Sequence, residues 1–214
     1  MRDVRFHNVT FELNRRHWNW WGSAELCKLV LKKRSPASTL GAIRDITLTN
    51  VIARVRGTST IVGHPERPIE NVRLSDISLT MLPENAPDKR ADDALYIESA
   101  RGVRVRDLSV RWGEEEAEPK WRSALVLRKV SDFDVDGFKG RQGLPSSNAP
   151  PILVEDVDRG VIRNSEATEG SRRLVHVGGV AARDVTVRDS RVPSGAVVAT
   201  FERSDLRRRV RVRD

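Results

Sequence analysis

Two segments of this chain, ITLTNVIA from Ile46 and VRLSDISL from Val72, share an eight-residue pattern. Positions one, three, six and eight are apolar, and position five is Asn or Asp. The alternation typical of a strand slips by one residue at position five, so a straight strand would turn half of its apolar side chains outward. Asn50 and Asp76, which occupy the slip, are among the residue types that best tolerate left-handed backbone. The pattern therefore predicts a strand, a one-residue corner and a second strand that face one core.

The same pattern recurs along the whole chain with start-to-start spacings of 25 to 42 residues. A plainer apolar run precedes several of the copies, as in ALYIE from Ala94, ALVLR from Ala124 and PILVE from Pro151. Each repeat thus carries three short strands, two tight corners and one variable loop. An eighth, incomplete copy starts at Val210. The expected corners are Asn8, Asn50, Asp76, Asp107, Gly137, Asn164 and Asp189.

Repeats of this length indicate a solenoid, in which each repeat buries its apolar face only by stacking on its neighbours. Leucine-rich repeats fit poorly, because the apolar positions here are chiefly Val and Ile and no amphipathic helix separates the copies. We therefore expect an all-β chain, a parallel β-helix of about seven to eight rungs that forms a single domain over residues 1–214. The long first spacing is one rung with an insertion at Asn14–Gly22 and a strand at Cys27–Lys33.

Three loops rich in Pro, Gly and charge fall at the same place in successive rungs. They are Leu82–Asp93, Gly113–Ser123 and Arg141–Pro150. Because the rungs stack, we expect these loops to lie side by side along one edge. Loops gathered on one edge of a rigid scaffold are where binding clefts are built.

The charge of the chain raises the question of an anionic partner, since the formal net charge is +8 and the pI is near 10.3. The Arg residues are scattered through the strands rather than gathered in one stripe, so we do not expect a nucleic-acid partner; a coding bias toward Arg explains them at least as well as a binding face does. No apolar run is long enough to span a membrane, and the start lacks the apolar run of a signal peptide. Cys27 is the only cysteine. No residue spacing suggests a metal site, and we expect no cofactor.

The segments GAIRDITLTNV, STIVGHPERPIENVRLSDISL, ALYIESARGVRVRDLSV and ALVLRKVSDFDVDGF resemble the C-terminal rungs of polygalacturonase-type enzymes. These form glycoside hydrolase family 28, within the pectin lyase-like right-handed parallel β-helices. The resemblance covers roughly residues 40–140. It implies a right-handed coil, a secreted or periplasmic location, and inverting hydrolysis of a pectin-like polysaccharide by carboxylic acids.

The catalytic motifs of that family are largely missing. Asn-Thr-Asp and Gly-His-Gly are absent. Asp92–Asp93 is the only Asp-Asp pair, but it follows the rungs that it should precede, and we interpret it as a solvated loop end. Gly63–His64 continues as Pro65, which favours a turn between strands. We therefore assign no catalytic residue, and expect either that N-terminal rungs and a cap are missing or that the chain is a relative that has lost the acids.

Two groups of residues remain candidates for binding a polysaccharide or acidic oligosaccharide. Lys32 and Arg34 lie about where the Arg-x-Lys of the family would grip a substrate carboxylate. The insertion holds three of the five tryptophans, whose rings could stack on sugars while Arg pairs with uronates; the alternative is an insertion packed on the first rungs. Its candidates are Arg15, Arg16, His17, Trp18, Trp20 and Trp21.

Trp112 and Trp121 flank an acidic loop that would repel a polyuronate, so we expect them to pack at the base of that loop. Three functions stay open at this point. The first is a polygalacturonase-type chain present as C-terminal rungs without the acids. The second is a non-enzymatic β-helix that binds polysaccharide or assembles as tail-spike-like fibres do. The third, a basic nucleic-acid binder, is remote.

Overall fold

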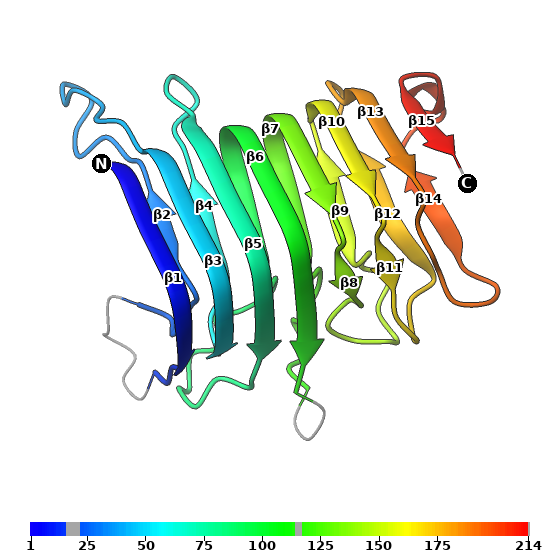
Figure 1. Ribbon diagram of the computed structural model, residues 1–214, viewed down its shortest axis with the longest axis horizontal. Coiled ribbons are helices and arrows are strands. Elements are labelled where there is room, and N and C mark those ends of the chain that lie inside the picture. The colour runs from blue at the N-terminus through cyan, green and yellow to red at the C-terminus, as the bar shows by residue number, and fades with distance from the viewer. Residues whose placement is uncertain (16–21, 114–116, 214) are drawn as a thin grey trace.

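The computed structural model describes residues 1–15, 22–113 and 117–213, and there the chain forms an all-β parallel solenoid (Figure 1). Its main ladder holds eight parallel strands, which enclose about six turns. The expected parallel β-helix is therefore confirmed, with the repeats in the order of the chain. The strands of the main ladder are β1 (Arg2–Glu12), β3 (Arg44–Val55), β5 (Ile69–Met81), β6 (Leu95–Trp112), β7 (Leu125–Asp136), β10 (Asp158–Arg163), β13 (Arg183–Arg188) and β15 (Val210–Arg213).

A second ladder forms another side of the coil. It runs through the beginnings of β6 and β7, and its other strands are β2 (Lys28–Val30), β4 (Ser59–Val62), β9 (Ile152–Glu155), β12 (Arg173–Gly178) and β14 (Val197–Phe201). The first rung is a single rung with an insertion, as expected, although β2 is shorter than Cys27–Lys33. Two short strands, β8 (Lys139–Gly140) and β11 (Glu166–Ala167), extend a third side, and one 3-10 helix, η1 (Ser204–Arg208), precedes β15.

The predicted corners all have left-handed backbone. Their φ angles lie between 50° and 78°, with Asn164 and Gly137 at the two ends of that range. Side chains at these corners also bond from rung to rung, since the Asn50 Nδ2 donates to the Asn8 Oδ1 at 2.9 Å. The corner residues are thus architectural and hold neighbouring turns in register.

Two further columns of left-handed residues bend each rung, and the sequence interpretation did not foresee them. One precedes each apolar pattern and contains Asp3, Asp45, Asn71, Gly102, Asp132, Arg159 and Asp184. The other contains Ser99, Lys129, Asp156 and Gly179. The bend between the second and the main ladder is therefore made by two left-handed residues, such as Ser99 and Gly102, rather than by one.

The core is a stack of aliphatic side chains, and at one position two neighbouring rungs compensate for one another in volume. Gly160 is the register partner of Phe133, and a Cβ on Gly160 would lie 2.0 Å from the Phe133 ring. Phe133 thus leaves room only for glycine at its partner position on the next rung. The whole inner surface belongs to one continuous cluster of buried residues.

The first rung leaves one end of this core open. Val4, Val9, Phe11 and Leu29 line an apolar hollow of about 390 Å³ at that end, and Phe6 on the same strand is 55% exposed. In residues 1–15, 22–113 and 117–213 there is no helix long and apolar enough to cross a membrane.

Candidate functional site

A hollow of about 460 Å³ lies on the outer face of the second ladder. Its floor is one column of outward-facing residues at the same register position on five strands, because the strand alternation points every second side chain outward. The register pairs each residue of this column with the next, from β2 through β4, β6 and β7 to β9. The column is Lys28, Thr60, Tyr96, Val126 and Leu153, all of which line the hollow.

The wall of this cleft is made by the ends of the variable loops. The expectation that these loops lie side by side is confirmed by the hydrogen bonds between them: the Arg122 amide donates to the Asp92 carbonyl at 2.6 Å, and the Gly143 amide donates to the Arg122 carbonyl at 2.7 Å. Arg90, Asp92, Asp93 and Arg122 thereby line the cleft.

Asp92 and Asp93 do not form a solvated loop end, and that interpretation was wrong for Asp93, which is only 4% exposed. Burial, reinforced by the charge of Asp92, raises the pKa of the Asp93 carboxyl to about 6, although the Ser123 amide donates to its Oδ1 at 2.8 Å. Asp92 is partly exposed and accepts from the Thr58 hydroxyl at 3.1 Å. The following loop folds over Asp93, which explains why burial was not visible in the local sequence.

Two long side chains on the floor are held in fixed positions. The Tyr96 hydroxyl donates to Glu98 Oε2 at 2.6 Å, and burial together with this bond raises the pKa of Tyr96. The guanidinium of Arg128 lies over the Tyr96 ring, 5.9 Å from its centroid, and its Nε donates to Glu155 Oε2 at 2.6 Å. These contacts preorganise the floor of the cleft, since neither side chain is free to rotate.

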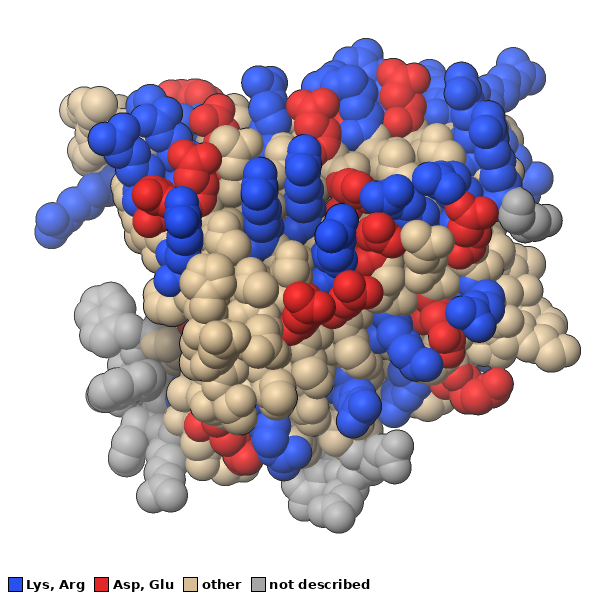
Figure 2. Space-filling model, in the orientation of Figure 1, with Lys and Arg blue, Asp and Glu red and all other residues tan. Residues whose placement is uncertain are grey.

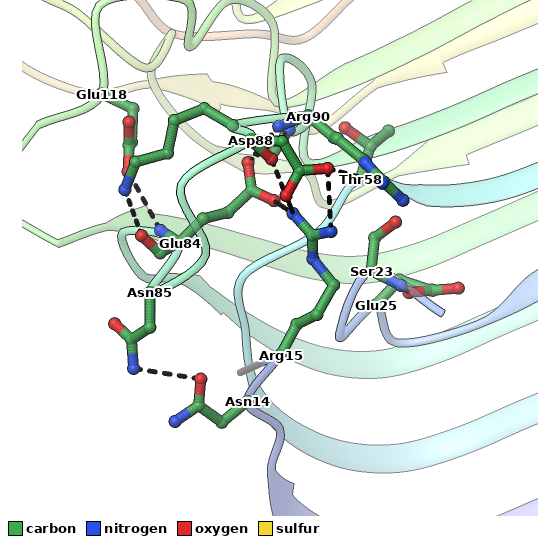
Figure 3. Close-up of polar contacts among 12 residues, drawn as sticks. Asn14, Arg15, Ser23, Glu25, Thr58, Glu84, Asn85, Asp88, Arg90 and Glu118 are labelled. Carbon is green, nitrogen blue, oxygen red and sulfur yellow. Dashed lines mark hydrogen bonds and ion pairs between the residues drawn. The ribbon is translucent and has the colours of Figure 1, made fainter. Parts of the chain in front are cut away.

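The loop that carries Asp92 is anchored by a buried ion pair (Figure 3). Arg15 and Glu84 are both 1% exposed, and the Arg15 Nη2 lies 3.2 Å from Glu84 Oε1. Arg15 also donates to the Asp88 carboxylate and to the Asp88 carbonyl, the latter at 2.6 Å, and the bond from Arg15 lowers the pKa of Asp88. The other oxygen of Glu84 accepts from the Ala91 amide at 2.7 Å. Arg15 therefore holds the loop that carries Asp92 in place beside the cleft.

The structure does not bring the remaining sequence candidates into this cleft. Arg15 is buried in the ion pair just described, while Lys32 and Arg34 are exposed on the segment after β2 and do not line it. The contribution of Lys32 and Arg34 to ligand binding stays a prediction. The candidates Arg16, His17, Trp18, Trp20 and Trp21 lie outside the described residues.

Two other predictions from the sequence are confirmed. Trp112 and Trp121 are buried at the base of their loop, with ring centroids 5.1 Å apart. Gly63–His64 leads into a turn, in which the His64 amide donates to the Arg67 carbonyl at 3.1 Å. Among the residues that the structure describes, no group of three or more His, Cys, Asp and Glu side chains could hold a metal ion.

The fold and cleft define a class, the parallel β-solenoids with a polar groove across their rungs. We found no protein-family model that matches the chain, and no curated protein or solved structure with significant similarity. The class is compatible with the pectin lyase-like β-helices.

Proposed function

We propose that this solenoid binds an acidic oligosaccharide in the cleft above β2, β4, β6, β7 and β9. The observation that supports this most directly is that carboxylate, guanidinium and hydroxyl groups converge on one hollow of about 460 Å³. The acidic sugar as ligand class rests on the resemblance to family 28 enzymes. The cleft runs across the rungs, so a linear polymer could extend over several of them.

Each part of the cleft has a role in this proposal. The exposed Arg122 guanidinium makes no hydrogen bond or ion pair within the described part of the chain, and it would pair with a uronate carboxylate. Asp92 and the Thr58 and Thr60 hydroxyls would accept or share hydrogen bonds with sugar hydroxyls. Val126 and Leu153, which are 1% and 7% exposed, would close the apolar floor beneath the bound sugar.

Hydrolysis of the bound sugar is the second candidate, and the raised pKa of the Asp93 carboxyl favours it. A carboxyl with a pKa of about 6 is protonated in part near neutral pH and can act as a general acid. Asp93 would protonate the glycosidic oxygen, while Asp92 would activate a water molecule. Without such an acid, the same cleft is a binding site only.

Calorimetric titration of oligogalacturonates tests the binding proposal. We expect Arg122→Gln to weaken binding about tenfold, because a charge-assisted hydrogen bond is lost. Arg191→Gln is the matched control, since Arg191 is exposed, carries the same charge and lies outside the cleft. A folded protein that binds no acidic oligosaccharide would overturn the proposal.

A reducing-end assay on polygalacturonate tests hydrolysis separately. Release of new ends that is abolished by Asp93→Asn would support the acid role. Binding without any release of ends would remove the second candidate and leave the first.

A further inference from the structure

A second polar hollow, of about 220 Å³, lies on the outer face of the main ladder and is separate from the cleft. Three arginines surround it. Arg73 on β5 is the register partner of Arg104 on β6, and Arg106 stands two residues further along β6. Ser75, the register partner of Arg106, occupies the fourth corner. The hollow is thus framed by four donor-bearing side chains from two adjacent strands.

The strand geometry requires these groups to be close together. Register partners on adjacent strands are about 4.8 Å apart, and outward residues along one strand are roughly 6.6 Å apart. Like charges at such neighbouring positions destabilise a sheet. Positive side chains gather over this face of the molecule (Figure 2).

Within the part of the chain that the structure describes, none of the three arginines makes a hydrogen bond or ion pair, although Asp134 and Asp136 are the register partners of Arg104 and Arg106 on β7. Asp134 and Asp136, which border the hollow on the next rung, are instead held by Arg163, whose Nη2 lies 2.9 Å from Asp134 Oδ2 and 3.1 Å from Asp136 Oδ2. Other outward arginines do have partners, as Arg183 has in Asp158 at 3.1 Å.

We propose that Arg73, Ser75, Arg104 and Arg106 form a binding site for one tetrahedral oxyanion, a sulfate or phosphate group. Three guanidinium groups and a hydroxyl that converge from four corners match an anion with three or four oxygens better than a planar carboxylate, which offers two. A doubly negative group also offsets two of the three arginine charges. Asp134 and Asp136 on β7 repel a second anion, so the site holds a single anionic group between β5 and β6.

Calorimetric titration at low ionic strength with inorganic sulfate, inorganic phosphate and acetate tests this site. We expect sulfate or phosphate to bind, and acetate to bind at least about tenfold more weakly. Replacement of the three arginines in Arg73→Gln, Arg104→Gln and Arg106→Gln should abolish binding. The triple control Arg44→Gln, Arg191→Gln and Arg211→Gln removes the same charge from scattered exposed positions and should bind within about twofold of the parent chain.

A second variant keeps the test decisive if the triple substitution disturbs folding. Ser75→Asp places a carboxylate among the three arginines, so it should occupy the site, prevent anion binding and raise the thermal stability in the absence of anion. Ser78→Asp makes the same change on the same strand, outside the hollow, and should leave binding intact.

The source of the group is distinguished by comparing a sulfated oligosaccharide with its desulfated form. Tighter binding of the sulfated sugar than of inorganic sulfate, lost in Ser75→Asp, indicates an ester carried on a polymer, whereas equal binding indicates a free anion. Three results would overturn the site: no binding of sulfate or phosphate, equal binding of acetate, or an equal loss of affinity in the scattered control.

Discussion

Arg15 and Glu84 form an ion pair of 3.2 Å in which both side chains are 1% exposed. The pair connects the segment after β1 to the loop after β5, two rungs further along the chain, and Glu84 in turn accepts from the Ala91 amide beside the cleft. The position of the cleft wall therefore depends on residues from two distant parts of the chain.

Removing one partner of this pair should be costly. We expect Arg15→Ala to lower the free energy of unfolding by about 3–5 kcal/mol, because Glu84 is left as a buried charge without a counter-ion. Urea denaturation measures the loss. Asn14→Ala removes an exposed hydrogen bond to Asn85 in the same segment and should change stability by less than about 0.5 kcal/mol. Equal effects of the two substitutions would contradict the role given to Arg15.

The contact between Gly160 and Phe133 predicts a compensating pair of substitutions. Gly160→Ala should cost about 1–3 kcal/mol, since its new Cβ would lie 2.0 Å from the Phe133 ring. The same substitution combined with Phe133→Leu should cost less than the two single changes added together. Gly41→Ala serves as control, because no atom lies within 4 Å of its added Cβ. Additive effects in the double mutant would rule out the proposed volume compensation.

The pKa of Asp93 predicts a specific dependence of stability on pH. A pKa raised to about 6 means that the folded state binds a proton more tightly than the unfolded state, so this group lowers stability as pH rises from about 4 to about 6. Asp93→Asn cannot ionise but keeps an oxygen for the Ser123 amide. We expect it to be more stable than the parent chain by about 3 kcal/mol at pH 8 and nearly equal at pH 4.

Urea denaturation of both proteins at several pH values measures this difference. Other carboxyls, such as Asp88 with its lowered pKa, titrate in both proteins and cancel in the comparison. A difference in stability that does not change between pH 4 and pH 8 would show that the Asp93 carboxyl titrates normally.

A separate prediction concerns the tryptophans of the insertion and their role in sugar binding. Trp20→Ala and Trp21→Ala should weaken the binding of acidic oligosaccharides without lowering thermal stability, if their rings stack on sugars. Titration and thermal denaturation of each variant measure the two properties. Lower stability with unchanged affinity would instead place these side chains against the first rungs.

The fold could be predicted from the sequence because each corner can be recognised within a short stretch of residues. Asn50 and Asp76 each sit where an apolar alternation slips, and such a slip is visible within eight residues. The column of left-handed residues just before each apolar pattern was missed because some of its members, such as Arg159, have no special tendency toward left-handed backbone. Stacking on the neighbouring rung imposes that conformation on them. The signal was nevertheless present in Asp3, Asp45 and Asn71, one residue before the pattern.

The cleft was harder to predict because it depends on stacking. Aligning ALYIE, ALVLR and PILVE places Tyr96, Val126 and Leu153 in one column, which could have indicated the floor. The burial of Asp93 could not be read in this way. It depends on the approach of Ser123, which lies one rung further along the chain.

The hydrogen bonds of this protein run from rung to rung, so they lie along the long axis of the coil (Figure 1). Tension applied to the two ends of the chain would therefore load these bonds one rung at a time, in a peeling geometry, rather than all together in shear. Each strand of a ladder pairs only with the strands of the neighbouring rungs, so the molecule should extend in small successive steps at low force. Under tension, the coil would therefore unfold rung by rung rather than in a single step at high force.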